Sequence, residues 1–157
     1  MKKIIAVLIA ALIMLCSVTC FAAPETVNAN DTGTNNGLIV IKKPETTVSS
    51  TTKQKYTLSA VSLQGVEVAL YSYNSSTGKF HLKRDAAGNP AVTTVGASGI
   101  YMRDVDLAME TNYLLVRAQY GDGNYQIVRL DITLLNQSLL DSIKGFAANF
   151  KSIFGGW

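Results

Sequence analysis

Cysteine and histidine are scarce in this chain of 157 residues, and their scarcity excludes several kinds of site. The two cysteines, Cys16 and Cys20, both lie within the first 22 residues, and His81 is the single histidine. Zinc sites are built mainly from Cys and His side chains, so one chain of this composition is poorly equipped to form one. A Ser–His–Asp triad would have to use His81, but no Gly-x-Ser-x-Gly nucleophile motif accompanies it. We therefore predict no catalytic residues, no metal and no cofactor, and we predict that the protein is not an enzyme.

An excess of charge of either sign is also lacking. The formal net charge is +3, and removal of Lys2 and Lys3 with an N-terminal leader would lower it to +1. Proteins that bind nucleic acid gather Lys and Arg on one face, and a balanced chain does not support such a face. We therefore predict that nucleic acid is not a partner.

No hydrophobic run reaches the length of a membrane-spanning helix. The apolar segment 4–15 contains about 12 residues, whereas a spanning helix needs about 20. Lys2 and Lys3 precede this segment, and small uncharged residues follow it as far as Ala22. This order of charged, apolar and small residues is typical of a secretory signal peptide. We predict a signal peptide at 1–22 and a secreted or cell-surface location.

Two alternatives to a cleaved signal peptide stay open. The uncharged run continues to Ala23, so a retained leader would act as a membrane anchor. Lipidation of Cys20 is the lesser alternative, because Thr19 stands where lipoprotein signals usually have Gly, Ala or Ser. If the leader is removed, the mature chain has no cysteine, and its fold depends on the core without disulfide bonds.

The segment 23–37 is polar, and Val27 is its single bulky apolar residue. Asn, Thr, Gly and Asp side chains bury too little apolar surface to offset the entropy lost on ordering. We predict a flexible linker here.

Alternating apolar and polar residues dominate from residue 38 to residue 135. The clearest example is a predicted β-hairpin with a Gly-Asp-Gly-Asn turn at 121–124. Its inward positions are Leu114, Val116 and Ala118 on one arm and Val128, Leu130 and Ile132 on the other. The other predicted strands are 38–42, 56–61, 66–73, 79–83, 91–95 and 99–105, and the first of them is an edge strand because Pro44 closes it. The polar segment 46–54 is predicted to be a loop. Seven or eight short strands with frequent turns predict an all-β sandwich.

The same region resembles bacterial immunoglobulin-like domains of secreted and cell-surface proteins. The residues that carry the resemblance are Ile41, Pro44, Tyr56-Leu58-Ala60, Gly65-Val66-Val68-Leu70, Ile100-Tyr101-Met102, Val105-Leu107, Asn112-Tyr113-Leu114-Val116-Ala118 and the turn 121–124. The resemblance implies an Ig-like Greek-key β-sandwich at 38–135 and a binding or structural role, and it does not identify a ligand. It also places Tyr113 at a tyrosine corner, with its hydroxyl bonded to upstream backbone. Glu110-Thr111 stands where the family usually has glycine, and the Cys…Trp…Cys signature is missing.

The C-terminal segment 136–157 has a different periodicity. Its bulky apolar residues recur every three or four positions, as on one face of an amphipathic helix. Ser138 is the predicted N-cap, the helix is predicted at 138–154, and Gly155-Gly156 ends it. We name the apolar stripe the association face; it consists of Leu139, Leu140, Ile143, Phe146, Phe150, Ile153, Phe154 and Trp157.

A helix of this length is marginal by itself in water, so its apolar stripe needs a surface to pack against. Three surfaces are considered: its own sandwich, another protein or a second copy, and a lipid membrane. The polar face carries Lys144 and Lys151 against Asp141, which gives little electrostatic attraction to anionic lipid. We predict that the helix mediates protein association, with insertion into a membrane surface as the alternative.

Two further features have a functional and a simpler interpretation. Asp104, Asp106 and Asp122 would suit a weak calcium site, but the simpler interpretation is turn chemistry and solvated carboxylates. Several tyrosines on alternating strands would suit a carbohydrate-stacking face, although such residues more often cap a sandwich with their hydroxyls in water. These tyrosines are Tyr71, Tyr73, Tyr113, Tyr120 and Tyr125.

Overall fold

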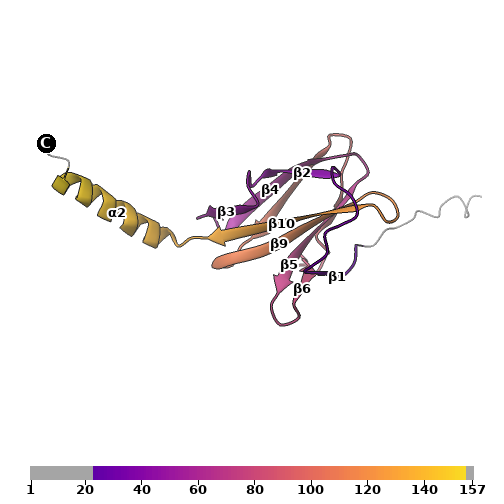
Figure 1. The fold of residues 1–157 in the computed structure, drawn as a ribbon, viewed down its shortest axis with the longest axis horizontal. Coiled ribbons are helices and arrows are strands. Elements are labelled where there is room, and N and C mark those ends of the chain that lie inside the picture. The colour runs from indigo at the N-terminus through magenta and orange to yellow at the C-terminus, as the bar shows by residue number, and fades with distance from the viewer. Residues whose placement is uncertain (1–22, 155–157) are drawn as a thin grey trace, which may run out of the picture.

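The computed structural model describes residues 23–154, which form two β-sheets and one C-terminal helix (Figure 1). The strands are β1 (Thr26–Asn28), β2 (Ile39–Lys43), β3 (Val48–Thr51), β4 (Lys55–Ser62), β5 (Glu67–Asn74), β6 (Lys79–Leu82), β7 (Val92–Thr94), β8 (Ile100–Asp106), β9 (Glu110–Gln119) and β10 (Tyr125–Leu134), and the helix is α2 (Gln137–Phe154). The larger sheet has the order β1-β6-β5-β9-β10-β3, with β7 also paired to β5, and the smaller has the order β2-β4-β8. The prediction of an all-β sandwich with a C-terminal helix is confirmed at this level. The predicted leader at 1–22 lies outside the described residues.

The main core lies between the two sheets. Leu58 and Ala60 of β4, together with Tyr101 of β8, face the inward residues of the larger sheet and are buried. The predicted inward positions of the β9–β10 hairpin are buried in the same cluster or packed against it, and β9 and β10 pair in register along their whole length. Period-two alternation therefore identified the core-facing residues correctly.

The polar segment predicted as a loop contains a strand. Val48–Thr51 forms β3, which pairs in parallel with β10. The predicted edge strand before Pro44 is confirmed, since β2 lies at one edge of the smaller sheet. With β1 and β3 added, the described residues contain ten strands, more than the seven or eight expected.

A second apolar cluster lies on the outer face of the larger sheet. It is formed by Tyr71, Leu115 and their buried neighbours Ala69, Phe80 and Leu82, together with Val27 from the N-terminal segment. Val27 lies opposite Phe80, because β1 pairs with β6. The prediction of a flexible linker at 23–37 is therefore wrong: this segment, which we call the N-terminal strap, is ordered because it covers the outer cluster.

The side chain of Gln126 on β10 holds the end of the strap. Its Oε1 accepts hydrogen bonds from the backbone N–H groups of Gly37, Leu38 and Ile39 at 2.9, 2.8 and 3.0 Å. Its Nε2 donates to the Ile39 carbonyl at 3.1 Å. One amide side chain thus satisfies four backbone groups where the strap turns into β2.

Two other side chains of β10, those of Arg129 and Tyr125, hold the middle of the strap. Arg129 donates to the carbonyls of Ala29 and Asp31 at 2.5 and 2.6 Å. The Tyr125 hydroxyl donates to the Asp31 carboxylate at 3.0 Å. Polar groups of the strap that would otherwise oppose burial are therefore paired with the outer face of the sheet.

The corner between β8 and β9 depends on Asn112. Its Oδ1 accepts from the Ala108 N–H at 2.8 Å. Its Nδ2 donates to the carbonyls of Ala108, Glu110 and Ile132 at 2.9, 3.2 and 3.2 Å. Glu110, at the position where the resembling family usually has glycine, adopts a left-handed φ of 76°. Tyr113 is half exposed and, among the described residues, makes no hydrogen bond to upstream backbone, so the predicted tyrosine corner is wrong and Asn112 braces the turn instead.

Two tyrosine hydroxyls are buried, those of Tyr71 and Tyr101, and that of Tyr71 has no hydrogen-bond partner among the described residues. Burial raises the pKa of each to about 12, from an ordinary value of 10.0. In the unfolded chain both tyrosines ionise near pH 10, while the folded state keeps them neutral. The contribution of the two tyrosines to stability is therefore complete below pH 10. As the pH rises from 10 to 12, the free energy of unfolding falls by up to about 3 kcal/mol for each tyrosine.

Urea unfolding at several pH values from 7 to 11.5 checks this expectation. The double variant Tyr71→Phe, Tyr101→Phe is expected to lose much of the alkaline slope and to keep most of its stability at pH 7, because the Tyr71 hydroxyl has no partner to lose and the Tyr101 hydroxyl loses at most its interaction with Arg103. Tyr120→Phe is the matched control, since Tyr120 is 51% exposed. An alkaline slope unchanged in the double variant would contradict the assignment.

Candidate association surface

Helix α2 begins directly after the larger sheet ends. The Leu135 N–H donates to the Thr51 carbonyl at 2.8 Å, so pairing with β3 continues past the end of β10. Asn136 then caps the helix, because its Oδ1 accepts from the N–H and the hydroxyl of Ser138 at 2.9 and 2.7 Å. The predicted N-cap, Ser138, is therefore wrong by two residues, and the helix starts at Gln137.

The helix extends away from the sandwich (Figure 1). Of the association face, Leu140 is half-buried, Ile143 is 56% exposed and Phe146 is 72% exposed. The predicted helix over 138–154 is confirmed. The side chains of the other members, Leu139, Phe150, Ile153, Phe154 and Trp157, lie outside what the structure describes. Across residues 23–154, no helix combines the length and the apolar character required to span a membrane.

A second exposed apolar surface lies on the outer face of the smaller sheet. Val40, Val61 and Ile100 stand opposite one another on its three strands, and Met102 follows on β8. Each of these side chains is about half exposed or more. The two sheets thus differ: the strap covers part of the outer face of the larger one, while this row on the smaller one is open to solvent.

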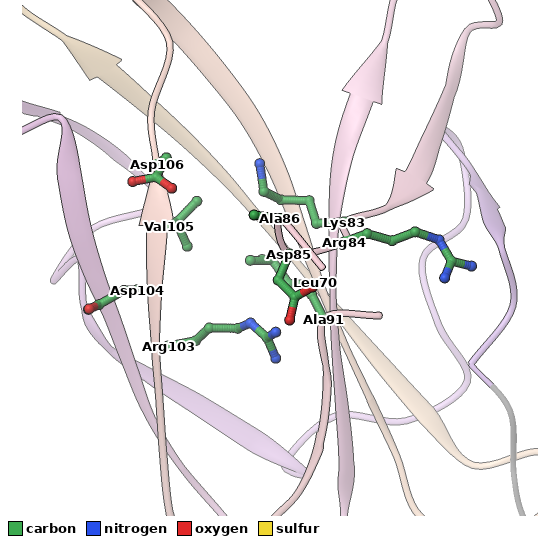
Figure 2. Close-up of a pocket in the computed structure, with 10 residues that line it drawn as sticks. All are labelled: Leu70, Lys83, Arg84, Asp85, Ala86, Ala91, Arg103, Asp104, Val105 and Asp106. Atoms are coloured by element: carbon green, nitrogen blue, oxygen red, sulfur yellow. The ribbon is translucent and has the colours of Figure 1, made fainter. Parts of the chain in front are cut away.

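A groove of about 200 Å³ lies between β8 and the segment 83–91. In Figure 2 the Arg103 side chain extends into it toward Asp85, whereas Asp104 points to the other side of β8. The groove combines acidic and basic groups.

Two of the charged groups of this groove, Asp85 and Arg84, have structural roles. Asp85 accepts from Asn89 Nδ2 at 3.0 Å and from the N–H groups of Asn89 and Ala87 at 2.8 and 2.9 Å. These bonds, with that from the Asn89 side chain foremost, hold the pKa of Asp85 below its usual value. Arg84 pairs with Glu25 of the strap at 2.6 Å. Asp85 therefore closes a turn, and Arg84 fixes the strap.

The residues that would serve metal or acid–base chemistry lie in three places, with Asp104 and Asp106 together on β8. His81 Nε2 contacts the Thr77 hydroxyl at 2.8 Å. Asp104 accepts from the Thr57 hydroxyl at 2.6 Å and lies 3.5 Å from Lys55 Nζ, and the hydrogen bond from Thr57 is the main cause of its lowered pKa. Asp122 lies in the turn between β9 and β10. Within the described part of the chain, no three His, Cys, Asp or Glu residues are grouped so that they could hold a metal ion.

The five tyrosines of interest are separated into different environments. Tyr71 is buried, and Tyr120 lies beside the β9–β10 turn. The guanidinium of Arg117 lies over the ring of Tyr125, 4.4 Å from its centroid. Tyr73 and Tyr113 contact each other with ring centroids 6.2 Å apart. Sequence spacing alone could not show this contact, because it depends on the register of β5 against β9.

Comparison with protein-family models finds no match for this chain, and comparison with curated proteins finds none either.

Proposed function

We propose that this chain is a non-enzymatic secreted or cell-surface module whose helix α2 mediates protein association, in the first instance with a second copy of itself. In this proposal residues 1–22 are the signal peptide, and residues 38–135 are an Ig-like Greek-key sandwich that presents the helix. The two-sheet architecture and the resemblance of its strand residues to bacterial immunoglobulin-like domains support this view of the sandwich.

The observation that carries the proposal is the position of α2. Only Leu135 and Asn136 separate the helix from β10, and the helix extends away from the sandwich (Figure 1). Ile143 lies on its apolar stripe and is exposed to solvent. An isolated helix of 18 residues is marginal in water, and Gly145 lowers its stability by about 1 kcal/mol relative to alanine. Packing of the association face against a partner would supply the missing stability.

A protein partner suits the helix better than a membrane does. The polar face of α2 has few basic residues, so lipid binding would depend almost entirely on apolar insertion. A second copy offers another association face of the same kind, and two amphipathic helices bury each other's apolar stripes when they pack together. Membrane insertion is the competing function, and the experiment separates the two.

The test compares the mature chain from Ala23 with the double variant Ile143→Asp, Phe146→Asp. We expect the parent chain to form a dimer or small oligomer in sedimentation velocity, and the variant to weaken the association at least tenfold by desolvating carboxylates at the contact. Ser142→Asp is the control, because it adds charge to the adjacent polar face.

Vesicle co-sedimentation with phosphatidylglycerol–phosphatidylcholine mixtures completes the test. A monomer that binds these vesicles through Ile143 and Phe146 would contradict self-association and favour the membrane alternative. A parent chain that neither associates at high micromolar concentration nor binds vesicles would contradict both.

A further inference from the structure

A row of directly opposed side chains crosses the outer face of the larger sheet. Tyr73 stands opposite Phe80, Tyr113 stands opposite Asp131, and Asp131 stands opposite Val48. The two halves of the row meet where the rings of Tyr73 and Tyr113 come within 6.2 Å of each other. Four strands, β5, β9, β10 and β3, therefore contribute one residue each to a continuous surface beside Phe80.

This surface is open to solvent. Tyr73 is 40% exposed and Tyr113 is 50% exposed, while Phe80 is buried beneath the edge of the row and supports the Tyr73 ring at 5.3 Å. The N-terminal strap packs on the same face over the cluster that includes Tyr71 and Leu115, which lie one row further along the strands. The strap thus covers one part of the face and leaves the tyrosine pair uncovered.

The groups around the two tyrosines are polar and mostly neutral. The Asp131 carboxylate has no hydrogen bond or ion pair to any residue that the structure describes. The next row contains Thr111 and Thr133, whose hydroxyls bond to each other at 3.0 Å, and Ser50 stands opposite Thr133 on β3. Two aromatic rings that meet edge to face at 77°, hydroxyls and one available carboxylate are therefore gathered on one face of the sheet.

We infer that this tyrosine platform, formed by Tyr73, Tyr113 and Asp131 with the hydroxyls of Thr111 and Thr133, binds an uncharged polysaccharide. The apolar C–H face of a sugar ring packs on an exposed tyrosine ring, and the tyrosine hydroxyl stays available to water or to the sugar. A carboxylate accepts hydrogen bonds from two sugar hydroxyls, and such charge-assisted bonds are the stronger kind. The span from β5 to β10 is about 10 Å, which suits an extended chain of sugars.

Other ligand classes fit the platform less well. Nucleic acid and acidic polysaccharides would meet the Asp131 carboxylate, and Arg129, the cation in the adjacent row, already donates to the carbonyls of Ala29 and Asp31. A lipid surface would have to cover the carboxylate and the hydroxyls without pairing them, which is costly. The inference depends on the tyrosine platform and not on helix α2, so it stands independently of the proposed association.

The test uses the mature chain from Ala23 in native gels that contain hydroxyethylcellulose, xylan, mannan or glycol chitin. Pull-down on insoluble cellulose and chitin accompanies the gels. We expect at least one of these polysaccharides to retard the parent chain. Tyr73→Ala and Tyr113→Ala should each weaken that binding on the order of tenfold, and Asp131→Ala should weaken it as well.

Tyr120→Ala is the matched control, because Tyr120 is exposed to the same degree as Tyr113 but lies outside the platform. It should bind as tightly as the parent chain. Thermal unfolding of each variant shows whether it is folded, and Tyr113→Phe should keep most of the affinity because the ring is retained. The inference is overturned if no polysaccharide retards the parent chain, or if folded Tyr113→Ala and Asp131→Ala variants bind as well as Tyr120→Ala.

Discussion

A protein that begins at Leu38 is expected not to fold cooperatively at 25 °C, although it retains every strand predicted from the alternation of residues. Its missing part is the N-terminal strap. Without the strap, the outer cluster around Tyr71 and Leu115 is exposed to water. Arg129 also loses the two carbonyls to which it donates.

The expected loss is large relative to the stability of a small domain. Burial of Val27 contributes about 1.5–3 kcal/mol, and each hydrogen bond lost between the strap and the sheet adds about 0.5–1.5 kcal/mol. Together these losses approach the 5–15 kcal/mol by which native domains are usually stable. Urea unfolding followed by circular dichroism measures the effect against the chain from Ala23.

Two point variants make the same expectation testable in the full chain from Ala23. Val27→Asp introduces an unpaired charge between β1 and β6 and is expected to destabilise by more than about 3 kcal/mol. Asn36→Ser lies in the same strap with an exposed side chain and is expected to change stability by less than about 0.5 kcal/mol. A cooperative transition of normal midpoint in the protein that begins at Leu38 would mean that the strap adds no stability.

Replacement of Asn112 by alanine is expected to be the most damaging single change at a residue that is not part of the apolar core. The substitution removes the side chain that bonds both backbone groups of Ala108 and the carbonyls of Glu110 and Ile132. Glu110 then has no brace for its left-handed backbone, a conformation that costs about 1–3 kcal/mol for a residue other than glycine. The expected loss is about 2–4 kcal/mol.

Chemical denaturation of Asn112→Ala measures this loss, with Asn124→Ala as the control. Asn124 is exposed in the β9–β10 turn, where its backbone carbonyl accepts from the Tyr120 N–H and survives the substitution. Adding Glu110→Gly to Asn112→Ala should recover part of the stability, because glycine adopts the left-handed conformation without strain. Equal effects of the two asparagine substitutions would contradict the role assigned to Asn112.

The sequence predicted the parts of the fold that depend on local periodicity. Leu114, Val116 and Ala118 alternate with polar neighbours, and this pattern places them in the core whatever their partners are. The apolar stripe of α2 is equally local. The N-cap of α2 was predicted two residues too late because Asn136 and Ser138 are both good N-cap residues. Only the backbone geometry selects between them.

The strap could not be predicted because its stability comes from distant side chains. Val27 is the only apolar signal in a polar segment, and the pattern of β1 is too short to recognise. Gln126 and Arg129, which hold the strap, appear in the sequence as ordinary polar residues of a strand. Nothing in the neighbourhood of either residue indicates that it bonds backbone about 90 residues earlier in the chain.

The tyrosine platform could be predicted only in part from the sequence, for a related reason. Tyr73 and Tyr113 were recognised among five tyrosines, but the sequence gives no ground for choosing this pair. Their contact follows from the antiparallel register of β5 and β9, and Asp131 joins them through the register of β9 and β10. Such a surface is assembled across strands, so it leaves no motif along any one of them.

The bond between Arg129 and Ala29 joins residues 100 positions apart, and this separation has a kinetic consequence. Closing so long a loop lowers the conformational entropy of the chain before the contact contributes any favourable free energy. Chains with many distant pairings therefore fold slowly. A growing polypeptide can pair β1 once β6 has been synthesised, but Arg129 cannot hold the middle of the strap until β10 has been made. The contacts between the middle of the strap and β10, at the two ends of the sandwich sequence, therefore form only when the last strand is in place.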